Sequence, residues 1–132
     1  MDDFTLRPVK DSGERQEFAT GARRDRQAGK GRFDLLPPDG LLAVALHFEA
    51  GAEKYGDENW TKGIPLGRYL DSAMRHLCAF RAGDRTEDHL AAATWNCLCG
   101  LSTYLRVRAE LLPAELDDVT ERGKGIPWPG KQ

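Results

Sequence analysis

The sequence has 132 residues, of which 40% are hydrophobic, and a formal net charge of −2. This length fits one domain with a modest core, and the small net charge gives no basic field for binding nucleic acid. No apolar stretch is long enough to cross a membrane. The acidic N-terminus is not a signal peptide, and three cysteines in apolar helical patterns indicate reduced core thiols. We therefore expect a single cytoplasmic domain over residues 1–132.

Residues 1–36 lack sustained periodicity and are expected to form a basic N-terminal arm. Glycines interrupt its basic residues, which are Arg15, Arg23, Arg24, Arg26, Lys30 and Arg32. Such an arm is either a solvated basic tail or a lid whose Lys30 and Arg32 approach a phosphate group.

A first long helix is predicted over residues 41–55. Leu42, Leu46, Glu49 and Glu53 share one face of it, which starts apolar and ends in two carboxylates. If this face packs inward, a divalent cation is the simplest compensation for the two charges, because Mg²⁺ prefers carboxylate oxygens. The alternative is that both glutamates lie on the solvated side of the helix.

The loop over residues 57–64 and the second helix, residues 65–82, carry further candidates. Trp60 either plugs the end of a helical bundle or stacks on a base. Asp71 and Arg75 lie four residues apart, which suits an intrahelical ion pair or a metal ligand beside a phosphate contact. His76 is a core histidine or a neighbour of a metal site. The expected apolar side is Leu66, Leu70, Ala73, Leu77 and Phe80.

A third helix is predicted to run to about Arg108, with Thr86 as its N-cap and two acids, Glu87 and Asp88, in its first turn. Its expected core side is Leu90, Thr94, Leu98, Leu101 and Leu105. A second face of small and polar groups consists of His89, Ala92, Ala93, Asn96 and Gly100. That face leaves room for a neighbouring helix or for a ligand. Residues 109–132 form a tail with a helical turn or two, whose Trp128 is expected to dock on a surface.

The fold class that follows is all-α, with a bundle of three long helices and short terminal segments. No strand-like alternation of apolar and polar residues occurs.

Six blocks of sequence form a specific combination across about residues 20–100. They read TGARRD at 20–25, GKGRFDLLPP at 29–38, EAGAEKYGD at 49–57, NWTKG at 59–63, RYLDSAMRHL at 68–77 and HLAAATWN at 89–96. Together they resemble the phage dATP/dGTP diphosphohydrolases, also called MazZ. These are relatives of MazG in the all-α nucleoside triphosphate pyrophosphatase superfamily.

The resemblance implies hydrolysis of dGTP and dATP to monophosphate and pyrophosphate, in phages that make 2-aminoadenine nucleotides, by a homodimer or homotetramer. It implies Mg²⁺ or Mn²⁺ held by the catalytic pair Glu49 and Glu53 and by later acids, for which Asp71 and Asp88 are candidates. The superfamily pattern of Glu-x-x-Glu and Glu-x-x-Asp is absent, since the first pair is four residues apart. The candidate substrate contacts are Lys30, Arg32, Lys54, Asn59, Trp60, Arg75, His89 and Asn96.

Two other functions stay open at this point. His76, Asp88 and His89 suggest an HD-type phosphohydrolase, although the dipeptide here is Asp-His rather than His-Asp. The third interpretation is a non-catalytic helical interaction module whose acids all lie on the surface.

Overall fold

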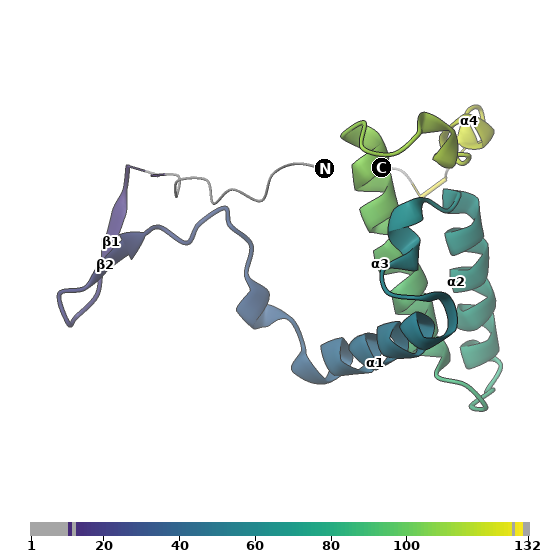
Figure 1. The fold of residues 1–132 in the computed structure, drawn as a ribbon, viewed down its shortest axis with the longest axis horizontal. Coiled ribbons are helices and arrows are strands. Elements are labelled where there is room, and N and C mark those ends of the chain that lie inside the picture. Colours follow the sequence, from purple (N-terminus) through teal and green to yellow (C-terminus); the bar gives the residue numbers. More distant parts are fainter. Residues whose placement is uncertain (1–10, 12, 128, 131–132) are drawn as a thin grey trace. The chain divides into compact units, whose positions relative to one another are not determined.

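The computed structural model describes residues 11, 13–127 and 129–130, and the chain divides into two compact units, Met1–Leu36 and Pro37–Gln132. The second unit contains three long helices, α1 (Pro38–Tyr55), α2 (Leu66–Arg81) and α3 (His89–Arg108) (Figure 1). The predicted all-α fold is therefore confirmed. None of the helices in the described ranges is long and apolar enough to span a membrane.

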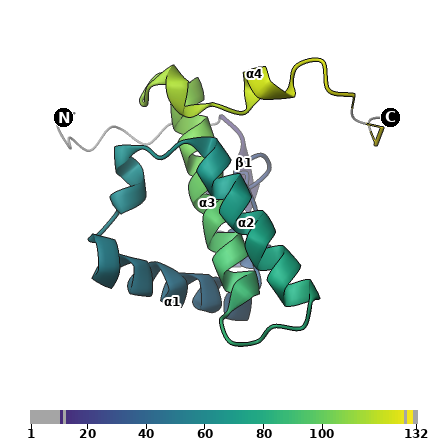
Figure 2. The same ribbon diagram turned by 90° about the vertical axis from the view of Figure 1, so that its right-hand side faces the viewer.

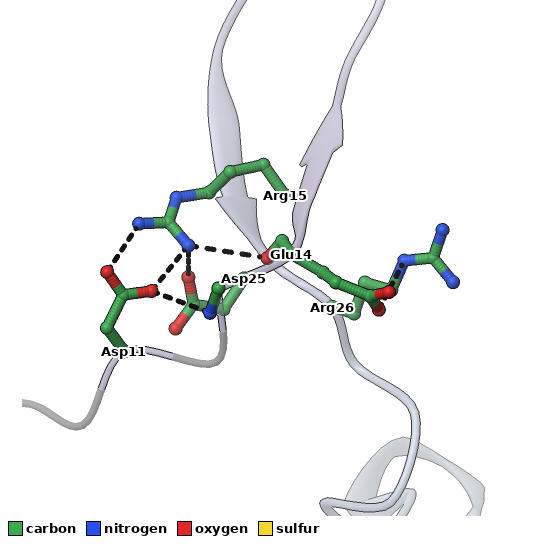
Figure 3. Close-up of polar contacts among 6 residues, drawn as sticks. Asp11, Glu14, Arg15, Asp25 and Arg26 are labelled. Carbon is green, nitrogen blue, oxygen red and sulfur yellow. Dashed lines mark hydrogen bonds and ion pairs between the residues drawn. The ribbon is translucent and has the colours of Figure 1, made fainter.

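The first unit contains a small hairpin that the sequence analysis did not predict. Strand β1 (Arg15–Glu17) pairs antiparallel with β2 (Arg23–Asp25). The guanidinium of Arg15 lies 2.7 Å from Asp11 and 2.8 Å from Asp25, and Arg26 lies 3.2 Å from Glu14 (Figure 3). These ion pairs lie at the surface, where water and salt screen them, so they contribute little to the stability of the hairpin. A short 3₁₀ helix, η1 (Phe33–Leu35), follows.

Helix α1 ends where the sequence indicates. Gly56 has φ 90° and donates its N–H to the carbonyl of Ala52 at 2.8 Å. Only glycine adopts this φ readily, so the helix stops and the chain turns into η2 (Asn59–Lys62).

Helices α2 and α3 run antiparallel and side by side, and α1 crosses near the end where α2 finishes and α3 begins (Figures 1 and 2). The α2–α3 contact is close because α3 presents small side chains to it. A Cβ at Gly100 would lie 3.3 Å from the Cβ of Tyr69. The buried residues of α3 are His89, Ala92, Ala93, Asn96, Cys99 and Thr103.

The predicted core side of α3 is therefore wrong. Leu90, Leu98, Leu101 and Leu105 are between 47% and 53% exposed. Large side chains would hold the two backbones apart, whereas alanine and glycine allow close packing along the whole contact. The leucine face is left without a covering element among the described residues.

In α2 the predicted apolar side is confirmed in part. Leu66 and Ala73 are buried, whereas Leu70 and Leu77 are exposed and Tyr69 is buried in addition. Of the three cysteines only Cys99 is a core thiol, and burial raises its pKa to about 11. Cys78 and Cys97 are exposed, so the prediction that all three lie in the core is wrong.

Helix α3 begins later than predicted. Asp84 Oδ1 accepts hydrogen bonds from the backbone N–H and the hydroxyl of Thr86 at 2.8 and 2.7 Å. Thr86 is thus part of the turn before the helix, and Asp88 occupies the N-cap position. Pro65 likewise precedes α2 as its N-cap rather than opening it.

The tail contains two short helices, η3 (Ala114–Leu116) and α4 (Thr120–Gly123), in agreement with the predicted turns. The backbone N–H of Gly67 donates to Asp118 Oδ1 at 2.8 Å, which ties the tail to the start of α2. Trp128 lies outside the described residues.

Replacing Gly63 with alanine is expected to lower the free energy of unfolding by about 1–3 kcal/mol. Gly63 has φ 100°, and an added Cβ would lie 2.7 Å from Leu116 Cδ1. Urea denaturation measures the change, with Gly123→Ala as the control because no atom lies within 4 Å of its added Cβ. Equal stability of the two variants would show that the tail does not pack on Gly63.

Candidate functional site

A cavity of about 310 Å³ lies among the end of α1, η2, α2 and α3. Its aromatic lining consists of Phe48, Tyr55, Trp60, Tyr69 and Trp95. Its polar lining includes Asn59, Arg68, Ser72, Arg75 and Asn96. Four predicted substrate contacts, Asn59, Trp60, Arg75 and Asn96, thus border one cavity. Flat aromatic walls with a few convergent polar groups are typical of sites that bind a nucleobase or a similar ring.

Asn96 is 5% exposed, and its Nδ2 donates to the carbonyl of Ala92 at 2.8 Å. One amide hydrogen is therefore used inside α3, which leaves the second N–H and the oxygen Oδ1 for a ligand. The neighbouring Trp95 holds a buried indole N–H that has no hydrogen-bond partner in the described part of the chain. A buried donor without an acceptor lowers the stability of the fold, so the indole N–H of Trp95 is a donor that a ligand in this cavity could satisfy.

Arg75 pairs with Asp71 one turn earlier on α2, and both side chains are about two-thirds exposed, at 66% and 68%. This is the ordinary intrahelical ion pair that the spacing predicts. The carboxylate of Asp71 is therefore paired with the guanidinium of Arg75 and is not grouped with other carboxylates around a metal site. Its role as a metal ligand stays a prediction.

Glu49 and Glu53 are exposed, so of the two alternatives the one with both glutamates on the solvated side of α1 is the one observed. Helix α1 packs on the indole of Trp95 through Phe48, whose ring centre lies 6.1 Å away. One residue further along an α-helix lies about 100° around its axis, which turns Glu49 away from α3. Leu42 and Leu46, on the same face, are exposed as well.

Glu49 instead borders an open groove together with Asp57, Glu58 and Trp60. Lys54 is exposed at the end of α1, with its Nζ 5.2 Å from the ring centre of Tyr55. Among the described residues, no three of Glu49, Glu53, Asp71 and Asp88 bring their oxygens close enough together to hold one ion.

A different group is brought together where α2 ends and α3 begins. His76 Nδ1 lies 2.9 Å from His89 Nδ1, and Glu87 Oε2 lies 3.9 Å from the same atom of His89. The ligand atoms of these three residues lie within 4.8 Å of one another, so they could hold a metal ion. The sequence singled out His76 and His89 in the HD-type interpretation, whereas Glu87 was not among the predicted metal ligands.

The surroundings of this group are charged and partly buried. Hydrogen bonds from Thr86, with a smaller contribution from His89, lower the pKa of Asp84 to about 2. Burial lowers the pKa of His47, and the adjacent His76 lowers it further. A second cavity, of about 580 Å³, is lined by His47, Asp88 and His89 among others. Asp88 and His89 therefore border a different cavity from Asn96.

Lys30 and Arg32 belong to the first unit. Arg32 holds Asp34 with two hydrogen bonds, at 2.8 and 2.7 Å, and both side chains are exposed. Lys30 is also exposed. An anion would therefore compete with Asp34 for Arg32.

Comparison with known proteins gives one match. Residues 20–111 match the model of the family described as dATP/dGTP diphosphohydrolase, N-terminal. The match covers well over half of the chain, which therefore belongs to this family. Searches of curated proteins and of solved structures found no match.

Proposed function

We propose that this member of the dATP/dGTP diphosphohydrolase family is a metal-dependent pyrophosphohydrolase. Its substrates would be the purine deoxynucleoside triphosphates dGTP and dATP, cleaved to monophosphate and pyrophosphate in the cytoplasm of an infected host cell. The family match over residues 20–111 carries this proposal. In a phage with 2-aminoadenine DNA, the reaction removes dATP and supplies dGMP.

The aromatic cavity supports the binding part of the proposal. A base inserted beside Trp60 can stack on its ring and meet the polar atoms of Asn96. Arg68 and Arg75 line the same cavity, so their guanidinium groups can lie against the triphosphate and balance its charge. The Asp71 contact of Arg75 would be exchanged for phosphate oxygens.

The exposed carboxylates of α1 suit Mg²⁺ or Mn²⁺. Mg²⁺ is usually held by one or two carboxylates together with water and substrate phosphates, rather than by a closed protein cage. Glu49 and Glu53 are exposed and one helical turn apart, which fits an ion that enters with the nucleotide. When bound, such an ion neutralises phosphate charge and lowers the pKa of the attacking water. Asp71 and Asp88 are not grouped with these glutamates among the described residues, so either would have to approach the ion when the nucleotide binds.

Product analysis tests the proposal. The protein is incubated with each deoxynucleoside triphosphate and Mg²⁺ or Mn²⁺, and the products are separated by chromatography. Monophosphate with pyrophosphate is expected. Nucleoside with tripolyphosphate would instead favour the HD-type reaction, for which the contact of His76 with His89 is the relevant observation. Absence of metal-dependent turnover would favour the non-catalytic module.

Self-association is expected to cover the leucine face of α3, since exposed contiguous apolar surface commonly marks an interface. Light scattering after size exclusion should show a homodimer or homotetramer. Leu101→Glu should convert the oligomer to a monomer, because burying an unpaired charge at the centre of this face would cost more free energy than the interface provides. Leu111, 74% exposed in the loop after α3, gives the control Leu111→Glu. A monomeric parent protein would contradict the expectation.

A further inference from the structure

The junction of α2 and α3 presents nitrogen and carboxylate donors in one place. His89 is 4% exposed, and its Nδ1 lies 2.9 Å from Nδ1 of His76. Glu87, whose side chain is 68% exposed, lies 3.9 Å from the same nitrogen and can rotate toward it. Two imidazoles and one carboxylate are the donors of many zinc sites with three protein ligands.

A second carboxylate lies close to the ring of His89. Asp84 Oδ1 accepts from the backbone N–H and the hydroxyl of Thr86, which leaves Oδ2 facing His89. Asp84 Oδ2 lies 3.1 Å from the buried Nε2 of His89. Nε2 makes no well-aligned hydrogen bond among the described residues. A ring hydrogen on Nε2 would turn to Asp84 and would leave the lone pair of Nδ1 directed toward His76 and Glu87. A carboxylate behind a histidine ring is the usual support of a metal-binding imidazole.

We propose that His76, His89 and Glu87 bind a divalent transition-metal ion, with Zn²⁺ the expected occupant. With Zn–N bonds of about 2.1 Å, two nitrogens of a tetrahedral complex lie about 3.4 Å apart. The observed 2.9 Å therefore requires only a small separation of the rings. Imidazole donors favour Zn²⁺, Co²⁺ or Ni²⁺ over Mg²⁺.

The site joins α2 to the turn before α3, because His76 belongs to α2 and Glu87 to that turn. Three protein ligands leave a fourth position for water or a small ligand, and the cavity of about 580 Å³ borders Glu87 and His89. The proposal uses neither Glu49 nor Glu53, so it does not depend on the proposed hydrolysis of nucleotides. The competing arrangement is a hydrogen bond in which the two histidines share one proton.

Titration of the metal-free full chain with Co²⁺ tests the site, since tetrahedral Co²⁺ absorbs visible light. The exposed thiols of Cys78 and Cys97 also bind such ions, so the titration is made in a Cys78→Ser, Cys97→Ser background. We expect saturation at one Co²⁺ per chain, displacement by Zn²⁺ but not by Mg²⁺, and a higher melting temperature with metal.

Variants separate this site from others. His76→Ala and Glu87→Gln should weaken Co²⁺ binding at least about tenfold, and Asp84→Asn about 10–100-fold by loosening His89. Glu87 is exposed, so its variant tests the site without disturbing the core. The control is Glu115→Gln, which changes an exposed carboxylate of η3 and should leave the Co²⁺ affinity unchanged.

Absence of saturable Co²⁺ binding, or unchanged affinity in both His76→Ala and Glu87→Gln, would overturn the proposal and favour the shared proton. Turnover of nucleotides with Mg²⁺ is measured separately, so failure of this site and failure of the proposed function can be told apart.

Discussion

Glu49→Gln is expected to lower the turnover of dGTP in Mg²⁺ about a hundredfold or more. Glutamine keeps the size of the side chain and removes the negative charge that a hard cation needs. A bound metal supplies several kcal/mol of charge stabilisation in the transition state, and each ~1.4 kcal/mol is a factor of ten in rate. Glu53→Gln should act in the same direction with a smaller loss.

The exposure of Glu49 makes this variant informative. Its side chain lies outside the core, so the melting temperature should stay unchanged and a loss of turnover reports on chemistry. Glu115→Gln, a carboxylate on exposed η3, is the matched control and should retain full turnover. A Mg²⁺ titration of both variants completes the measurement. Near-normal turnover of Glu49→Gln at low Mg²⁺ would remove α1 from the metal site.

The end of α1 and, to within one residue, the start of α2 could be predicted from local chemistry. Gly56 ends α1 because it adopts a positive φ, and Pro65 stands at the start of α2. These signals act within a few residues of the chain. The hairpin of β1 and β2 was missed because each strand has three residues and carries only polar side chains, so neither shows an alternation of apolar and polar residues.

The faces that form the core could not be predicted from hydrophobicity. In α3 the leucine face is exposed and the face of Ala92, Asn96 and Gly100 is packed. A hydrophobic pattern identifies a surface to be covered, but not whether a helix of the same chain or another subunit covers it. The close approach of Gly100 to Tyr69 decided the contact with α2.

The candidate site was predicted in part. One cavity is bordered by four of the predicted substrate contacts, Asn59, Trp60, Arg75 and Asn96. All four belong to the sequence blocks that carry the family resemblance. The contact of His76 with His89 spans the turn between two helices. Its geometry depends on how Asp84 and Thr86 shape that turn, which spacing alone does not determine.

Asn96→Ala is expected to reduce base selectivity more than it slows hydrolysis of the best substrate. The buried amide keeps Oδ1 and one N–H available beyond its bond to Ala92. Oδ1 and the free N–H can pair with a donor and an acceptor on the edge of the base, and that edge lies at a different distance in a two-ring purine than in a one-ring pyrimidine. A pyrimidine that leaves this buried amide unpaired costs about 1–3 kcal/mol, which corresponds to roughly tenfold to a hundredfold in relative kcat/KM.

The ratio of kcat/KM for dGTP to that for dCTP should therefore fall by this factor in Asn96→Ala, while kcat for dGTP changes only severalfold. Thr94→Ala is the control, since Thr94 is an exposed residue of the same helix whose hydroxyl bonds only to the carbonyl of Leu90. Melting temperatures of both variants separate loss of selectivity from loss of folding. Equal rates for dGTP, dCTP and dTTP in the parent protein would contradict any role of Asn96 in base recognition, because there would be no preference for the variant to lose.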